Sequence, residues 1–269
     1  MARVFFLLLM LTFGWPALAQ DRPIEVDLEL VLMADVSRSM APHELEIQRR
    51  GYSEALMTDA VYGAIQTGML GRIALTYVEW AGTQAIVVDW RLIETREDLD
   101  DFATELIVTY NPGLRRTSIT RALDFGTYLI ENNAFEGLRR VIDISGDGPN
   151  NDGGLVTAAR DRTIGKRITI NGLPLLTHGG EFDQWYMPGL DIYYQACVIG
   201  GPGSFSIPVH DWQGFAEAVR RKLVMEIANL TLPPERIYRA QSLEIDPTDC
   251  LIGEKIWAQR QRRGFFGGP

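Results

Sequence analysis

The stretch VDLELVLMA at residues 26–34, followed at once by DVSRS at residues 35–39, constrains how the rest of the chain can be arranged. Its first half alternates apolar and acidic residues, and its second half is continuously apolar, as in a strand buried at the centre of a parallel sheet. A polar run begins where the apolar run stops. We therefore expect a central strand whose carboxyl end carries Asp35, Ser37 and Ser39.

The rest of the chain alternates between strand-like and helix-like patterns. We expect strands at 72–80, 84–90, 139–145, 168–175 and 205–209, helices at 44–65, 99–108, 119–130 and 155–164, and a helical apolar stripe from Trp212 to Ile227. This alternation predicts an α/β fold with a doubly wound, mostly parallel sheet and helices on both faces. The link 81–83 is short enough to make 72–80 and 84–90 one antiparallel hairpin near the sheet edge.

The length of the chain bounds its domain organisation. A chain of 269 residues, 46% hydrophobic and 23% charged, fits one α/β domain with an insertion or a small appendage. We assign residues 20–230 to that domain. Within it, segment 177–203 is rich in Gly, Pro and aromatic residues and is expected to be an ordered insertion. Residues 231–269 form a C-terminal extension without an evident core of its own.

Residues 1–19 have the pattern of a secretory signal peptide. Arg3 precedes an apolar run from Val4 to Phe13, and Ala17-Leu18-Ala19 forms an A-x-A cleavage site. The alternative is an uncleaved anchor helix, which would need roughly 20 apolar residues and would have to accommodate Pro16. We therefore expect an exported protein, periplasmic or secreted, with no later transmembrane segment.

Charge and cysteine content narrow the function further. A formal net charge of −9 argues against a nucleic-acid partner, which favours a basic face. Cys197 and Cys250 lie too far apart in sequence for a short metal-binding motif. In an oxidising compartment two cysteines more often pair, so we expect a Cys197–Cys250 disulfide, with two buried free thiols as the alternative.

Three polar motifs follow strands or open a helix. They are DVSRS at 35–39, Thr117-Ser118 before the helix at 119–130, and GDGPNND at 146–152 after the strand at 139–145. In a doubly wound sheet such positions converge on one rim, where ligands bind. Their carboxylate and hydroxyl oxygens suit magnesium, manganese or calcium better than zinc.

This set of motifs resembles the metal-ion-dependent adhesion site of von Willebrand factor type A domains. Asp35, Ser37 and Ser39 match its first motif, Thr117 its second and Asp147 its third. The resemblance covers roughly residues 25–228. It is nearest to a bacterial family of exported type A-like proteins of unknown function, whose characteristic stretches are similar to VIDISGDGPNNDG, ITINGLP and CVIGGPGSF here.

The resemblance implies a binding module rather than an enzyme. The five matched residues would hold Mg²⁺, or else Mn²⁺ or Ca²⁺, and the ion would bind a carboxylate of a protein partner. One departure is that Arg115 and Arg116 stand where the family usually has glycines. These arginines would either repel the metal or recognise an anionic ligand. For each matched residue a purely structural role, as a helix cap or a turn residue, is the competing interpretation.

Two other functions remain open. GDGPNND is similar to the acidic metal motif of haloacid-dehalogenase-like phosphatases, but Ser37 occupies the position of that family's general acid. A structural envelope protein with a degenerate metal site is the other alternative.

The C-terminal extension alternates basic and aromatic side chains within 254–266. It would bind an acidic partner or an anionic membrane surface, or else pack one aromatic side chain on the domain.

Overall fold

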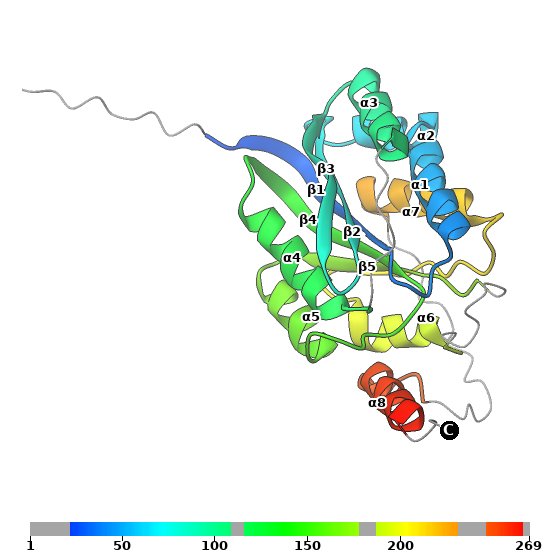
Figure 1. Cartoon of the computed structure of the whole chain (residues 1–269). Coiled ribbons are helices and arrows are strands. Elements are labelled where there is room, and N and C mark those ends of the chain that lie inside the picture. The colour runs from blue at the N-terminus through cyan, green and yellow to red at the C-terminus, as the bar shows by residue number, and fades with distance from the viewer. Residues whose placement is uncertain (1–21, 109–115, 178–186, 231–245, 266–269) are drawn as a thin grey trace, which may run out of the picture.

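The computed structural model describes residues 22–108, 116–177, 187–230 and 246–265 (Figure 1). Its sheet has the strand order β3-β2-β1-β4-β5. The strands are β1 (Ile24–Asp35), β2 (Ile73–Trp80), β3 (Gln84–Ile93), β4 (Phe135–Gly146) and β5 (Thr169–Pro174). Only β2 and β3 pair antiparallel, and they form the edge hairpin. The predicted α/β architecture, with one antiparallel hairpin, is confirmed.

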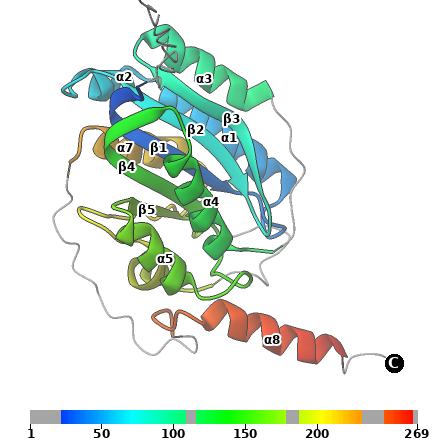
Figure 2. The same cartoon turned by 90° about the vertical axis from the view of Figure 1, so that its left-hand side faces the viewer.

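Strand β1 is central because both of its faces are apolar. Leu30 and Leu32 point into one core, and Val31 and Met33 point into the other. The first core is covered by α1 (Pro42–Leu56), α2 (Asp59–Gln66), α3 (Arg96–Val108) and α7 (Phe215–Ile227). The second is covered by α4 (Ile119–Glu131), α5 (Val156–Gly165), α6 (Leu190–Tyr193) and the π-helix Tyr194–Val198 (Figure 2).

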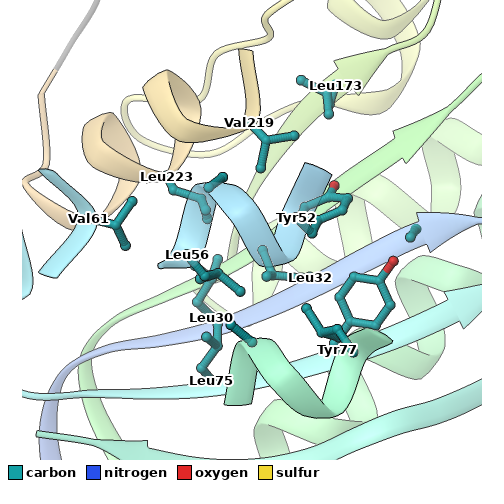
Figure 3. Close-up of a cluster of buried hydrophobic side chains, with 14 of the residues drawn as sticks. Leu30, Leu32, Tyr52, Leu56, Val61, Leu75, Tyr77, Leu173, Val219 and Leu223 are labelled. Atoms are coloured by element: carbon teal, nitrogen blue, oxygen red, sulfur yellow. The ribbon is translucent and has the colours of Figure 1, made fainter. Parts of the chain in front are cut away.

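The first core shows what holds α1 against the sheet. Leu30 and Leu32 of β1 meet Tyr52 and Leu56 of α1, while Tyr77 of β2 packs edge-on against Tyr52 with ring centroids 5.4 Å apart (Figure 3). Truncating a buried leucine in such a core costs about 2–5 kcal/mol. This packing fixes the start of α1, and therefore the loop that joins β1 to it.

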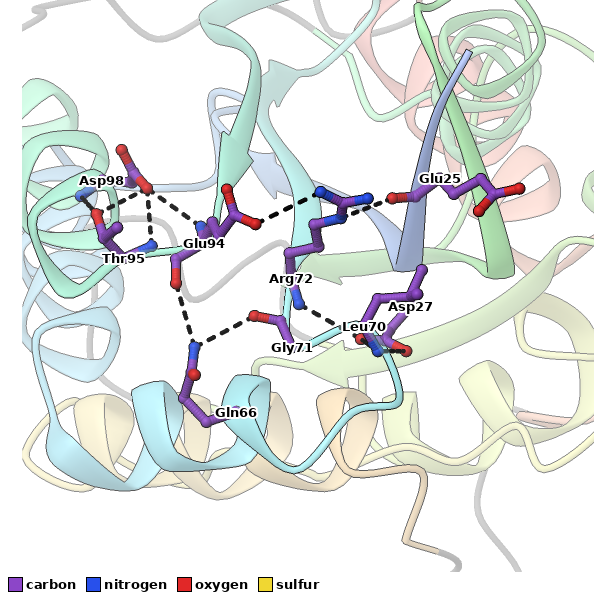
Figure 4. Close-up of polar contacts among 9 residues, drawn as sticks. All are labelled: Glu25, Asp27, Gln66, Leu70, Gly71, Arg72, Glu94, Thr95 and Asp98. Atoms are coloured by element: carbon purple, nitrogen blue, oxygen red, sulfur yellow. Dashed lines mark hydrogen bonds and ion pairs between the residues drawn. The ribbon is translucent and has the colours of Figure 1, made fainter. Parts of the chain in front are cut away.

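The amino end of the sheet is closed by polar contacts that serve only structure. The Asp27 carboxylate accepts hydrogen bonds from the backbone N–H groups of Leu70 (3.0 Å) and Arg72 (3.4 Å), while the Arg72 side chain reaches Glu94 (Figure 4). These contacts tie the loop before β2 to β1. They lie at the end opposite Asp35, so the candidate site does not use them.

Two sequence predictions are wrong in detail. The single helix expected at 44–65 is split into α1 and α2, because Thr58 takes an extended conformation and its hydroxyl accepts from the N–H of Val61 at 3.4 Å. The strand expected at 205–209 makes only isolated parallel bridges, from Ser206 to Gly172 and from Val209 to Leu175. The N–H groups of Ile207 and Val209 donate to the carbonyls of Gly172 and Pro174, but Pro174 has no N–H group to donate in return to Ile207, which interrupts the ladder.

The insertion and the extension meet at the disulfide. Cys197, in the π-helix, and Cys250 are bonded with Cα atoms 5.5 Å apart, as predicted. Helix α8 (Ile252–Phe265) follows directly, with Ile252 and Ile256 packed on the second core. No helix in the described ranges is long and apolar enough to cross a membrane.

Candidate metal centre

The loop after β1 is folded around the carboxylate of Asp35. This residue is fully buried at the last position of the strand. Its Oδ1 accepts a hydrogen bond from the Ser37 N–H at 2.7 Å, and the Ser37 carbonyl accepts from the Met40 N–H at 3.0 Å. The start of α1 is capped by Glu44, whose side chain accepts a hydrogen bond from the N–H of Ala41. Asp35 and Ser37 therefore do not cap that helix.

A chain of hydroxyl contacts connects this loop to the loop after β4. Ser37 Oγ lies 3.0 Å from Ser39 Oγ, and Ser39 Oγ donates to Asp147 Oδ1 at 2.8 Å. Gly146 permits this close approach, because a Cβ there would lie 2.9 Å from Asp35 Oδ2. The structure thus brings together four of the five residues matched in the sequence.

Thr117, the fifth matched residue, lines the same cavity from the loop before α4. Its N–H donates to Asn151 Oδ1 at 3.1 Å, and its carbonyl accepts from the Asn151 N–H at 2.9 Å. Ser118, and not Thr117, caps α4, because Ser118 Oγ accepts from the N–H of Arg121. The Thr117 hydroxyl is therefore not used as the helix cap.

The cavity at this rim has a volume of ≈ 260 Å³. It is lined by residues from the three predicted motifs and from the C-terminal helix: Ser37, Arg38, Ser39, Arg116, Thr117, Asn151 and Trp257. Arg116 has a left-handed backbone (φ 70°) and forms an ion pair with Asp152 at 2.9 Å. Arg115, the other arginine assigned to partner binding, lies outside the described residues.

The two carboxylates of the site are held in an unfavourable environment. Burial raises the pKa of Asp35 well above its usual range, and the neighbouring charge of Asp147 raises it further. Burial also raises the pKa of Asp147, to about 6. Among the described residues, no lysine or arginine forms an ion pair with either group. A bound cation would relieve this repulsion.

The donor set fits a divalent metal ion. Asp35 Oδ2 is buried and has no hydrogen-bond partner in the described structure. A buried acceptor without a donor is costly, and an ion would satisfy it. The described residues contain no group of three or more Asp, Glu, His or Cys side chains placed to hold a metal ion, so most of the oxygens here would come from hydroxyl groups. Such oxygen ligands suit magnesium, manganese or calcium.

Some residues of the rim were not identified from the sequence. Asn150 is fully buried, and its Oδ1 accepts from the Thr120 N–H at 3.1 Å, which fixes the start of α4. In the sequence, its place in the run GDGPNND was what could have indicated a role at the rim. The sequence gives no such indication for Trp257, because more than a hundred residues separate it from the nearest motif. Only the docking of α8 brings Trp257 to the cavity.

Comparison with known families gives one match. Residues 25–231 match the family described as "Protein of unknown function (DUF1194)". The chain belongs to this family. The predicted relation to a bacterial family of unknown function is thereby confirmed, and the DUF1194 match spans all three motifs of the rim. No curated protein matches the chain.

Solved structures show the fold of this DUF1194 protein. The pilus adhesin SpaC from Lactobacillus rhamnosus GG is similar with a TM-score of 0.55 at 10% identity, over 77% of this chain and 31% of that one. A von Willebrand factor type A protein from Catenulispora acidiphila has a TM-score of 0.48 at 14% identity, over 75% of this chain and 43% of that one. The fold shared with the adhesin is an α/β fold with a mostly parallel sheet.

A third similar structure is proximal thread matrix protein 1 from the mussel byssus, described with a zinc-occupied MIDAS motif. Its TM-score is 0.47 at 14% identity, over 77% of this chain and 49% of that one. The DUF1194 chain thus spans about half of the mussel protein and under a third of the adhesin. None of these descriptions names an enzyme.

Proposed function

We propose that this protein is an exported binding module that holds a divalent metal ion at the rim formed by β1, β4 and the loop before α4. Asp35, Ser37, Ser39, Thr117 and Asp147 are the proposed ligands, and Mg²⁺ is the proposed ion, with Mn²⁺ or Ca²⁺ as alternatives. The ion binds an acidic side chain of a protein partner. The activity is adhesion through the metal, without turnover.

The observation that carries this proposal is the buried, unsatisfied Asp35 Oδ2 beside a second, half-buried carboxylate, that of Asp147. The Ser39 hydroxyl is hydrogen-bonded both to the Ser37 hydroxyl and to Asp147, so these oxygens lie close together. Magnesium takes six ligands in near-octahedral geometry. Five ligands from the protein leave one position, and a carboxylate is the hard anionic group that suits it.

Export is part of the proposal. The signal-peptide pattern at 1–19 lies outside the described residues and stays a prediction. The Cys197–Cys250 disulfide supports export, because disulfides persist mainly in oxidising compartments.

The metal is tested first, by thermal unfolding of the mature protein in a chelator and after addition of Mg²⁺, Mn²⁺, Ca²⁺ or Zn²⁺. An ion that binds only the folded state adds RT ln(1 + [L]/Kd), about 2.7 kcal/mol at ~100-fold excess over Kd. We expect Mg²⁺ to raise the melting temperature. A melting temperature that none of the ions changes would refute the metal site.

The partner is tested by affinity capture from an envelope fraction with and without chelator. A protein retained only with Mg²⁺ supports the binding module. Phosphatase turnover by the metal-loaded protein would instead favour the enzyme alternative, although Ser37 leaves that reaction without its general acid.

A further inference from the structure

Helix α8 forms one side of the metal-centre cavity. Trp257 of α8 lines it together with Ser37, Ser39 and Thr117. The guanidinium carbon of Arg116 lies 5.5 Å from the centroid of the Trp257 ring, so an arginine of the rim and a tryptophan of the extension face each other. The C-terminal extension is therefore a wall of the candidate site.

Several contacts fix this wall in place. The Cys197–Cys250 disulfide ends two residues before α8, and Ile252 is buried in the second core. Glu254 Oε1 accepts a hydrogen bond from Asn150 Nδ2 at 2.7 Å. At Gly253 a Cβ would lie 1.9 Å from the Asn150 carbonyl oxygen, so the helix backbone rests directly on the loop after β4. The position of Trp257 relative to Asp147 follows from these contacts.

The cavity between wall and rim is small and has positive side chains beside it. Its ≈ 260 Å³ is just below the usual range for ligand pockets, about 300–1,000 Å³, and suits one side chain better than an extended surface. Arg38 is exposed and forms no ion pair with any residue in the described ranges. Arg116 is partly neutralised by Asp152. Arg38 thus offers a positive charge next to the metal.

We propose that α8 is part of the ligand site and restricts it to a single carboxylate side chain presented by a flexible acidic segment of the partner. The carboxylate binds the metal and pairs with Arg38, and its aliphatic stem packs on Trp257. A flat protein surface would contact α8 before its carboxylate reached the rim. This inference rests on the proposed function, because it requires the metal.

The probe is a short Gly/Ser peptide with one Asp and blocked ends, compared with its Asn counterpart by titration calorimetry. Wild-type protein with Mg²⁺ should bind the Asp peptide, and neither the Asn peptide nor chelator-treated protein should show binding. Trp257→Ala should weaken peptide binding on the order of tenfold, as truncation of a tryptophan at the centre of an interface does. Mg²⁺ should stabilise the Trp257→Ala variant as much as it stabilises wild-type protein, because Trp257 is not a metal ligand.

Further variants separate a local effect from misfolding. Arg38→Gln, at an exposed position, should weaken peptide binding and its dependence on salt, while Gln259→Ala on the exposed side of α8 should change nothing. The double variant Cys197→Ser/Cys250→Ser should behave as Trp257→Ala does, since it frees α8. Acetate, used in place of the peptide, tests whether a free small carboxylate is the ligand. If acetate binds as tightly as the peptide, the assignment to a side chain is overturned.

The two proposals fail in different ways. If no metal stabilises wild-type protein, the proposed function fails and this inference falls with it. If Mg²⁺ stabilises wild-type protein but the Asp peptide does not bind, or if Trp257→Ala and Arg38→Gln bind it as wild type does, only the role of α8 is refuted.

Discussion

Ser39 Oγ donates a hydrogen bond to Asp147 Oδ1 across 2.8 Å, although 108 positions separate the two residues in sequence. The contact joins the loop after β1 to the loop after β4. It follows from the parallel register of these strands, in which Ala34 lies opposite Ser145, each one residue before the last residue of its strand. Four of the five proposed ligands are therefore positioned by β1 and β4, which pair within the sheet.

Asp147→Ala should abolish stabilisation by Mg²⁺ and leave the fold intact. The residue lies at the partly exposed rim, and its carboxylate accepts from the Ser39 hydroxyl, a contact worth roughly 1.5–3 kcal/mol. Melting curves with and without Mg²⁺ measure the effect. Asp101→Ala, at an exposed position of α3, is the matched control and should respond to Mg²⁺ as wild type does. An insoluble Asp147 variant, or one with wild-type metal binding, would contradict the assignment.

The buried cluster between α7 and the sheet should make stability depend on pH. Glu226 accepts from Asn171 Nδ2 at 2.8 Å and contacts Lys222, whose Nζ also lies 2.5 Å from Asp143 Oδ1. Burial raises the pKa of Glu226 to about 7, and the nearby Asp143 charge adds to this. The folded state therefore keeps a proton that the unfolded state has already lost.

The free energy of unfolding should accordingly fall as pH rises from about 4.5 towards 7, by up to about 3 kcal/mol from this group. Glu226→Gln cannot titrate and should flatten that slope. Urea unfolding of both proteins across this range tests it. The same slope in both proteins would show that Glu226 is not responsible.

Removing the disulfide should destabilise the protein and release α8. The bridge spans 53 positions, and a loop of that size contributes about 4 kcal/mol in the chain-entropy model, against a typical total of roughly 5–15 kcal/mol. Cys197→Ser/Cys250→Ser should lower the melting temperature and increase protease cleavage near α8. Mass spectrometry of exported protein should find no free thiol before reduction, and finding both thiols free would refute the bridge.

Deleting the chain after Gly253 should leave binding to anionic liposomes unchanged. Three of its described side chains are used within the protein, because Ile256 packs on the second core, Trp257 faces Arg116 and Lys255 is paired with Asp249. These three side chains are then not available for the membrane contact considered for 254–266. Co-sedimentation of both proteins with liposomes measures this. Binding by the full chain that the deletion removes would restore the membrane alternative.

The sequence by itself determined the sheet and most of the proposed ligands. Continuous apolar character in β1 specifies a strand buried on both faces, and parallel strands place their following loops at one rim. Asp35, Ser37, Ser39 and Asp147 could be assigned together because each lies next to the end of β1 or β4. Local patterns missed the break at Thr58, where a side-chain cap competes with a helix that the apolar periodicity would continue.

Only the tertiary structure decided that the site is a cavity with α8 as its wall. Nothing local to Trp257 indicates that it lies against Arg116 or lines a cavity with Thr117. Its position depends on a disulfide to the insertion, on the fit of Gly253 against the Asn150 carbonyl, and on the burial of Ile252. Each of these contacts joins residues far apart in the chain, and a pattern of side chains along the sequence carries no distance between such residues.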